Sequence, residues 1–393
     1  MSLNLIADKI IKGRVYPALA RHQALPYTQA WREFEQHWPY TVPLRLQEYC
    51  NYHDVQLNLY TLDHDWPANA LYPIGLGFFD FEIDYFELLP SPVFTALREK
   101  NIRILFYYHE GDNPLCIKQR LDVLCDQHKL SHDRYIFVSA NTAAKNIPGF
   151  VYFTEFELWY WQRNSSWPAL DIHYGPRGRD FTVLNRLHKS WRALIMADLY
   201  QNAMLDKAYW SYCEPGKFSD ADCPIEIDAV SGLRAATEKF LTATPYFSDD
   251  FGNDKRNDHS TLMPEYHNNS YCNIVVESQF DFDQSDGVFL SEKTFKPIKH
   301  GQLFFIAGAA GSLQVLRDLG YRVFDEVLDN SYDQETNHTQ RWIKLRNAIV
   351  KAQPQLPKLF NQCQLDLEHN QRLFQSIKTD RLNSLIKDIN ESR

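Results

Sequence analysis

Five cations gather in one short stretch of a chain that is acidic overall. Between residues 177 and 192 they accompany a single carboxylate, Asp180, so the local formal charge is +4. The stretch spans a predicted strand and the predicted helix after it, which is where open parallel sheets bind ligands. Asn185 and Arg186 fall at the turn, where an amide and a guanidinium could hold a diphosphate. A solvated helix face would explain the same charges. The cations are Arg177, Arg179, Arg186, Lys189 and Arg192.

A second candidate is the run Ser-Glu-Lys-Thr-Phe-Lys-Pro that starts at Ser291. Ser291 can cap the helix that begins here, and Glu292 in the first turn suits the helix dipole. The Glu292 carboxylate could also accept hydrogen bonds from ribose hydroxyls, while Lys293 or Lys296 neutralises a phosphate. An ordinary capped helix is the alternative interpretation of the same residues.

A third candidate is a glycine loop between a predicted strand at 302–307 and a predicted helix at 312–319. Gly308 and Gly311 would let backbone N–H groups approach a phosphate or a sugar. The loop does not have the G-x-G-x-x-G pattern. A tight turn with Ser312 as the helix cap explains it equally well.

The first half of the chain offers a pair of carboxylates, Glu110 and Asp112, directly after a predicted buried strand at 102–108. A carboxylate at the carboxyl end of a strand could serve as a general base for a hydroxyl group. His109 lies on the same turn and is a third candidate. A polar turn without catalytic function is the alternative.

Metal and disulfide chemistry are not indicated. Residues 220–222 and 281–283 have the Asp-x-Asp pattern, but both lie in Asp-rich, turn-like stretches where chance matches are frequent. Seven widely spaced cysteines include no C-x-x-C pair, so neither a zinc site nor a disulfide framework is predicted. We therefore expect no bound metal and no cofactor.

Composition limits the class of protein. The chain has 393 residues, 44% of them hydrophobic, with 25 Phe, 22 Tyr and 9 Trp, which is enough for a large core and about two domains. A net charge of −9 disfavours a broad nucleic-acid-binding surface. No apolar run approaches the ~20 residues that span a bilayer, and no signal-peptide core opens the sequence. We expect a soluble, cytoplasmic protein without a transmembrane segment.

Strand-like and helix-like segments alternate, which is typical of an α/β fold with parallel sheets. We expect an N-terminal α/β domain at 1–165, a second at 177–333, a linker at 162–176 between them, and a helical C-terminal segment at 334–393. The predicted strands are 55–62, 78–86, 102–108, 135–138, 181–184, 208–212, 273–276, 302–307 and 322–324, and the predicted helices are 91–100, 115–130, 188–200, 291–300 and 312–319.

A series of short motifs runs through the second half of the chain. They are 181–186 (FTVLNR) with Lys189 and Arg192, 209–211 (YWS), 276–278 (VES), 290–298 (LSEKTFKPI), 308–312 (GAAGS), 319–321 (LGY), 324–325 (FD) and 369–370 (HN). The series resembles the donor domain of a group of bacterial and phage GT-B glycosyltransferase-like proteins, distantly similar to the α-1,3-fucosyltransferases. The resemblance covers residues 181–333. Glu292 and Lys293 match the Glu-Lys that contacts the nucleotide there, and Glu277 matches the Glu of an earlier motif.

The resemblance implies a GT-B-like architecture: two Rossmann-like domains that face a cleft, with a helical C-terminal tail. The second domain would bind a nucleotide-sugar donor, and the first a glycan or other hydroxyl acceptor. With the candidates named above, the residues expected to bind the donor are Asn185, Arg186, Lys189, Arg192, Glu277, Ser291, Glu292, Lys293, Lys296, Gly308 and Gly311.

The expected function is therefore metal-independent hexosyl or fucosyl transfer in glycan biosynthesis, with Glu110 or Asp112 as the base. Two alternatives remain open at this point. One is a non-catalytic nucleotide- or glycan-binding protein on the same fold. The other is a metal-dependent GT-A transferase that uses Asp281 and Asp283.

Overall fold

The computed structural model describes residues 2–7, 44–53, 55–63, 65–76, 79–99, 102–163, 171–247, 264–283 and 285–392. The chain forms two compact units: residues 1–155 together with 378–393, and residues 156–377. The domain limits expected from the sequence, 165, 177 and 334, stay predictions. Most of the expected linker lies outside the described residues, since 164–170 belong to the part that is not described.

The first unit contains a six-stranded parallel sheet in the order β2-β1-β3-β4-β5-β6. Aromatic rings fill its core; Phe137 stacks on Phe150 with ring centroids 4.9 Å apart. The strands are β1 (Ser2–Ile6), β2 (Gln56–Tyr60), β3 (Leu71–Leu76), β4 (Arg103–Tyr108), β5 (Tyr135–Ser139) and β6 (Phe150–Tyr152), and the helices are α3 (Leu44–Tyr52), α4 (Ser91–Arg98), α5 (Pro114–Gln127) and the 3₁₀ turn η1 (Thr142–Asn146).

The helix α15 (Lys378–Glu391) also belongs to the first unit, although it comes from the other end of the sequence. Its apolar side chains, including Leu382 and Ile386, are buried. Near the end of the helix, Arg103 Nη1 donates a hydrogen bond to the carbonyl oxygen of Ser392 at 2.6 Å. The helical tail expected from the sequence therefore contributes its last helix to the unit formed by the first residues.

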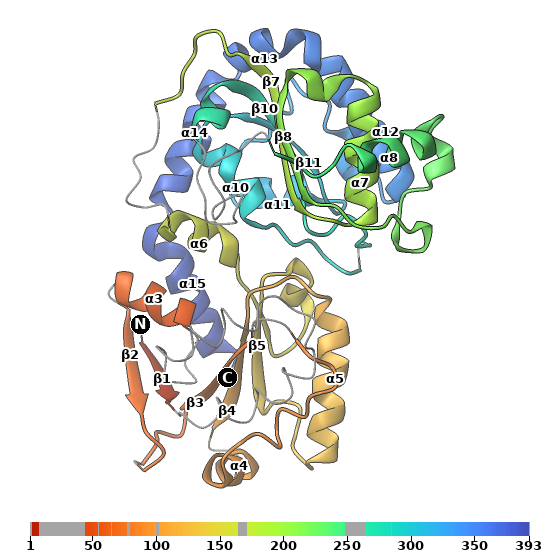
Figure 1. Ribbon diagram of the computed structural model, residues 1–393. Coiled ribbons are helices and arrows are strands. Elements are labelled where there is room, and N and C mark those ends of the chain that lie inside the picture. The colour runs from red at the N-terminus through yellow and green to blue at the C-terminus, as the bar shows by residue number, and fades with distance from the viewer. Residues whose placement is uncertain are drawn as a thin grey trace. The chain divides into compact units, whose positions relative to one another are not determined.

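The second unit contains a five-stranded sheet in the order β11-β10-β7-β8-β9, parallel except for β9. Figure 1 shows α7, α8 and α12 on one side of the sheet and α10 and α14 on the other. The strands are β7 (Arg179–Leu187), β8 (Ala208–Glu214), β9 (Tyr246–Phe247), β10 (Ser270–Val276) and β11 (Leu303–Ala307), and the helices are α6 (Glu155–Arg163), α7 (Ser190–Gln201), α8 (Leu233–Thr242), α9 (Pro264–Asn268), α10 (Glu292–Lys299), α11 (Ser312–Asp318), α12 (His338–Ala352), α13 (Leu356–Gln362) and α14 (Gln364–Ser376).

The strand order of the second unit reverses beside β7. From β7 the chain passes through α7 to β8 on one side, and it later returns to place β10 on the other side. In open α/β sheets, ligands bind outside the carboxyl ends of the two strands at such a switch point. The ends of β7 and β10 are therefore the first place to look for a site.

The expected α/β class with two parallel sheets and C-terminal helices is confirmed, but two predicted strands are wrong. Residue 78 is not described, and residues 79–89 form turns and irregular structure. The strand lies earlier, at β3, where Pro73 and Gly75 conceal it in the sequence. Residues 322–324 form no strand either. The Asn370 side chain bonds both the N–H and the carbonyl of Arg322, each at 2.8 Å, in place of a neighbouring strand.

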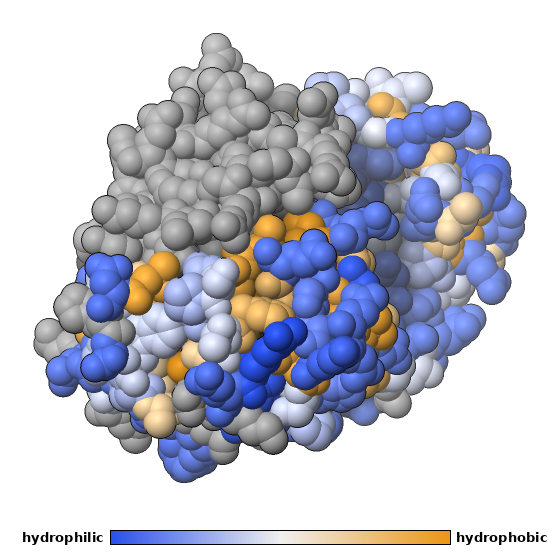
Figure 2. Space-filling view, turned by 90° about the horizontal axis from the view of Figure 1, so that it is seen from below, coloured by the Kyte–Doolittle hydropathy of each residue, from blue (hydrophilic) through white to orange (hydrophobic). Residues whose placement is uncertain are grey.

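Figure 2 shows a face on which hydrophilic side chains predominate and apolar ones form a smaller group. Within the described ranges, no helix is both long and apolar enough to cross a membrane.

Candidate functional site

A buried guanidinium joins the two strand ends at the switch point. Arg192 lies in the first turn of α7 and is only 4% exposed. Its Nη1 donates to the carbonyl of Leu187, the last residue of β7, at 3.2 Å, and its Nη2 to the carbonyl of Glu277, just after β10, at 3.1 Å. Its Nε has no hydrogen-bond partner among the described residues. Burial lowers the pKa of Arg192, an effect that Glu277 and Tyr212 partly oppose.

The amino end of α7 lies at the same place. Its N-cap residue, Lys189, makes no side-chain cap, and no acidic residue occupies the first turn. Instead the Lys189 Nζ donates to the carbonyl oxygen of Ser278, after β10, at 2.6 Å. A helix amino end with no carboxylate attracts anions, and two cations beside it strengthen that attraction.

Asn185 supplies a buried amide near the end of β7. Its side chain is 1% exposed, and neither Oδ1 nor Nδ2 has a partner within the described part of the chain. In the sheet it lies opposite Tyr212 of β8, whose hydroxyl bonds Nδ1 of His188 at 2.7 Å. A buried amide with no partner costs folding free energy of about 1–3 kcal/mol, unless water or a ligand satisfies it. Arg186, the next residue, is exposed.

Glu277 occupies the centre of the site and is completely buried. Its carboxylate accepts four hydrogen bonds: from the N–H of Ser278 at 3.0 Å, the N–H of Ser291 at 3.1 Å, the hydroxyl of Ser291 at 2.6 Å and the hydroxyl of Thr294 at 2.6 Å. With its acceptor positions used in this way, Glu277 organises the surrounding loops and the start of α10. The carboxylate also takes the place that an anionic ligand would need at that helix end.

The first turn of α10 presents a carboxylate and a cation. Lys293 Nζ lies 3.1 Å from Glu292 Oε1 and 3.3 Å from the Ser278 hydroxyl, and it is partly exposed. Burial alone would raise the pKa of Glu292, but Lys293 and the buried Lys296 outweigh it, so the pKa is lowered. Glu292 is therefore ionised at neutral pH and can accept hydrogen bonds.

The glycine loop has a structural explanation. A Cβ atom at Gly308 would lie 2.9 Å from Ser312 Oγ and 3.4 Å from Glu277 Cβ, and Gly311 has a φ of +88°. At the start of α11 the Asp333 carboxylate accepts from the N–H groups of residues 313 and 314, at 2.9 and 3.2 Å. The N–H of Gly311 donates to the Asp333 carbonyl at 2.8 Å. These three N–H groups are thus engaged within the protein.

Three of the segments named from the sequence, 177–192, 291–297 and 308–312, contribute residues that lie around Glu277. Arg192 and Lys189 reach the loop that follows β10, Ser291 and Thr294 bond the Glu277 carboxylate, and Gly308 packs against its Cβ. Ser278 and Thr294 lie within motifs named from the sequence but were assigned no role, and Asp333 was not singled out. A hydroxyl three residues after a helix cap is the signal that could have pointed to Thr294.

In the first unit, Glu110 and Asp112 follow the end of β4. Asp112 Oδ2 accepts from the Tyr108 hydroxyl at 2.5 Å, and burial together with this carboxylate raises the pKa of Tyr108 far above its usual value. Glu110 Oε1 lies 3.6 Å from His109 Nε2, and its side chain is 42% exposed. Of the two carboxylates, Glu110 is the more open to a ligand.

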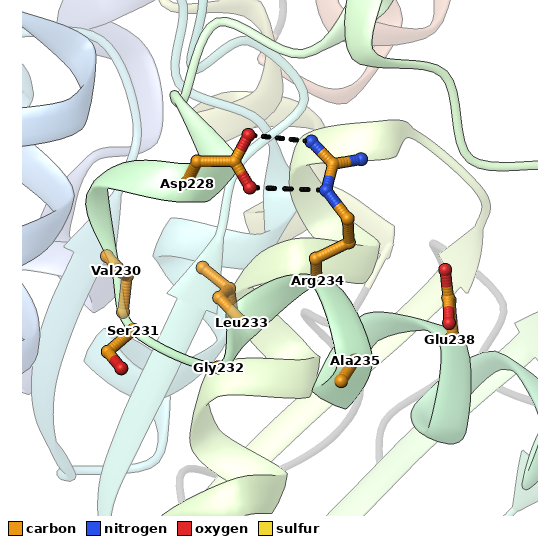
Figure 3. A pocket seen from close by; sticks show the side chains of 8 residues that line it. All are labelled: Asp228, Val230, Ser231, Gly232, Leu233, Arg234, Ala235 and Glu238. Atoms are coloured by element: carbon orange, nitrogen blue, oxygen red, sulfur yellow. Dashed lines mark hydrogen bonds and ion pairs between the residues drawn. The ribbon is translucent and has the colours of Figure 1, made fainter.

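A different hollow opens at the start of α8 (Figure 3). There the Arg234 guanidinium bonds Asp228 and also Asp220, so the Asp220 of one Asp-x-Asp pair is engaged in an ion pair. Asp283 of the other pair lies 3.8 Å from Nε2 of His338. The described residues contain no group of three side chains placed to hold a metal ion. The hollow is lined by Asp228, Val230, Ser231, Gly232, Leu233, Arg234, Ala235 and Glu238, none of which was expected to bind a donor.

No protein-family model matches the chain, and no curated protein matches it by sequence. Solved structures do match. One is a DNA-modifying β-glucosyltransferase studied with and without uridine diphosphoglucose, at 9% identity and a TM-score of 0.41, over 99% of this chain and 100% of that one. Another is OtsA, at 13% identity and a TM-score of 0.39, over 88% of this chain and 77% of that one. A third is the UDP-forming α,α-trehalose-phosphate synthase of Burkholderia vietnamiensis, at 13% identity and a TM-score of 0.39. That match covers 82% of this chain and 75% of that one.

Proposed function

We propose that the protein is a glycosyltransferase that moves a sugar from a nucleotide-diphosphate donor to a hydroxyl acceptor. One observation carries the proposal: the buried Arg192, whose Nε has no partner among the described residues, joins the ends of β7 and β10 beside the amino end of α7. A fixed cation beside the amino end of a helix at a switch point suits a diphosphate.

Charge favours the α7 side of the site for the diphosphate. The amino ends of α10 and α11 already hold the carboxylates of Glu277 and Asp333. Lys189 and Arg192 lie at α7, with the exposed Arg186 at the end of β7. These cations would neutralise the charge that develops on the departing nucleoside diphosphate, which is the main requirement for this transfer. Side chains in this role make a metal ion unnecessary.

Two further groups suit the rest of the donor. The ionised Glu292 carboxylate would accept hydrogen bonds from ribose hydroxyls, while Lys293 beside it contacts a phosphate oxygen. The buried amide of Asn185 offers both a donor and an acceptor to a ligand group of complementary pattern. The proposal covers hexosyl and fucosyl donors alike.

In the reaction, the acceptor oxygen forms a bond to the sugar carbon while the bond from that carbon to the phosphate oxygen breaks. The acceptor proton passes to a carboxylate of the first unit. We assign this role to Glu110, since its carboxylate is partly exposed beside His109, whereas that of Asp112 receives the Tyr108 hydroxyl. The nucleoside diphosphate leaves with the bonding electrons.

The proposal is tested by a thermal-shift and calorimetric screen against UDP, GDP, CMP and their sugar conjugates. A ligand at about 100 times its Kd adds about 2.7 kcal/mol to the free energy of unfolding, so binding is easily detected. Failure of every nucleotide to bind would contradict the proposal. Binding without sugar transfer to any acceptor would favour the non-catalytic alternative, and activity abolished by EDTA would favour the metal-dependent one.

A further inference from the structure

A second buried arginine, Arg341, lies behind the site in the first turn of α12. It is 1% exposed, and the partners of its N–H groups are main-chain carbonyls and one imidazole. Nε donates to Gly308 O at 3.1 Å, and Nη2 to Phe280 O at 2.5 Å and to His338 Nδ1 at 2.8 Å. Nη1 donates to the carbonyls of residues 335 and 336, at 2.9 and 3.3 Å. One planar group therefore ties three separate loops together.

Two of these loops form the candidate donor site. Phe280 follows Glu277 by three residues in the loop after β10, whose Ser278 carbonyl receives Lys189. Gly308 begins the loop after β11 and packs against Glu277. Arg341 itself reaches neither Lys189 nor Arg192 in the bonds described, so its influence on a ligand would pass through the two loops.

We propose that Arg341 is a positioning residue for the donor site, which sets the distance between the loops after β10 and β11 and so the geometry of Glu277, Ser278 and Lys189. The inference rests on the proposed function. It predicts that a change at Arg341 weakens donor binding more than its effect on stability would explain.

The chemistry of Arg341 favours a role in positioning the two loops over a role in stabilising the fold. Burial of the guanidinium lowers its pKa to about 10, although several carboxylates lie near enough to oppose this, Asp333 first among them. Such burial is unfavourable, and an apolar side chain often serves stability equally well at a buried charged position. Only the planar fork of arginine reaches Gly308 O and Phe280 O at once; a lysine has a single nitrogen. The Phe280 ring, 4.5 Å from the guanidinium, holds the fork in its plane.

Arg177 provides a matched control in the same unit. It is also buried, its pKa is also lowered to about 10 by burial, and it lies 4.0 Å from the Phe360 ring. Its guanidinium likewise donates to main-chain carbonyls, those of His267 at 2.8 Å and Ser270 at 2.6 Å. Ser270 begins β10, so Arg177 acts at the amino end of the strand whose carboxyl end carries the site.

The test compares Arg341→Lys with Arg177→Lys in the full chain. Hydrogen–deuterium exchange without ligand should show lost protection at residues 277–283 and 308–312 in Arg341→Lys and unchanged protection there in Arg177→Lys. With the nucleoside diphosphate that binds the wild type, Arg341→Lys should raise Kd by about ten- to a hundredfold, and Arg177→Lys should leave it unchanged.

Equal protection of these loops in the two variants, or loosened loops with unchanged Kd, overturns the inference. If no nucleotide binds the wild type, the proposed function fails, while the exchange data still decide whether Arg341 holds the loops. If Arg341→Lys does not fold, His338→Ala replaces it, since it removes one acceptor and keeps the guanidinium. A smaller loss of protection in the same two loops is then expected, and no loss contradicts the inference.

Discussion

The Ser291 hydroxyl donates to Glu277 Oε2 across 2.6 Å, so the residue that caps α10 is bonded to the residue that directly follows β10. The pair joins two segments fourteen residues apart in the sequence. Thr294 and the N–H groups of Ser278 and Ser291 complete the ring of donors around the same carboxylate. The candidate site is therefore built around an internal anion.

Replacing that anion by an amide should be costly. In Glu277→Gln, the amide nitrogen replaces an oxygen that accepts from a main-chain N–H, since each Glu277 oxygen accepts from one. At least one buried hydrogen bond is therefore lost, and that N–H is left unsatisfied. We expect the free energy of unfolding to fall by about 2–3 kcal/mol, measured by urea denaturation. Asp220→Asn, at an exposed carboxylate, is the control and should change it by less than about 1 kcal/mol. An unchanged midpoint in Glu277→Gln would show that the carboxylate charge is not needed.

Arg192 should matter most for diphosphate binding. In Arg192→Met, the cation is lost while much of the buried volume is kept. We expect Kd for the bound nucleoside diphosphate to rise by about ten- to a hundredfold, as for a lost hydrogen bond to a charged group. Titration calorimetry measures the change. Arg346→Met is the matched control, because Arg346 lies on α12 and contacts Asp198. Equal affinity in the Arg192 and Arg346 variants would remove the basis of the proposed site.

Variants of Glu110 and Asp112 should change turnover without changing donor affinity. In Glu110→Gln, turnover should fall by about 10²- to 10⁴-fold because the proton acceptor is gone. Donor affinity should stay the same, since the donor residues belong to the other unit. Asp112→Asn should have the smaller effect on turnover. Steady-state kinetics combined with donor titration checks this, and a larger loss in Asp112→Asn would transfer the role of base to Asp112.

A stacked pair of buried histidines should make the second unit sensitive to acid. The rings of His267 and His300 lie 4.5 Å apart, and neither nitrogen of His300 has a partner in the described part of the chain. Burial, chiefly, lowers the pKa of His267 to about 4 and that of His300 well below its usual range. His267 Nδ1 faces Gln302 Oε1, while Lys296, Lys299 and Arg177 are the nearby charges.

The lowered pKa values of the two histidines determine how stability changes with pH. Between pH 4 and pH 6.5 the unfolded chain binds more protons at these sites than the folded one, so stability is complete above about pH 6.5 and falls as the pH drops. The protonation of His267 alone should lower the free energy of unfolding by about 2 kcal/mol between pH 7 and pH 5. Urea denaturation at the two pH values measures the loss. His300→Phe should reduce it, whereas the exposed His132→Gln should not. Equal losses in wild type and His300→Phe would contradict the assignment.

Local patterns predict the part of the site that follows the strand ends. The apolar run within β7 and the helix after it place Asn185 to Arg192 at the carboxyl edge, because parallel strands end on one side of a sheet. The same reasoning places Glu277 and Gly308. The sequence does not reveal that Glu277 and Asp333 close the amino ends of α10 and α11, since these partners are far apart along the chain.

Strand β3 was not predicted, for a different reason. Pro73 and Gly75 signal a turn locally, yet pairing with β1 and β4 outweighs that preference. Local sequence patterns also do not predict which unit α15 joins. Its amphipathic sequence predicts a helix, but only long-range packing decides that it joins the first unit.

The return of α15 to the first unit has a consequence for biosynthesis. Residues 1–155 are synthesised before residues 156–377, yet the unit they form lacks one of its helices until residues 378–393 have been made. The second unit needs only residues 156–377, so it can be complete before the first unit is. During translation, the apolar surface that Leu382 and Ile386 will cover stays exposed to chaperones, and a nascent chain stalled before α15 should be recognised as unfinished.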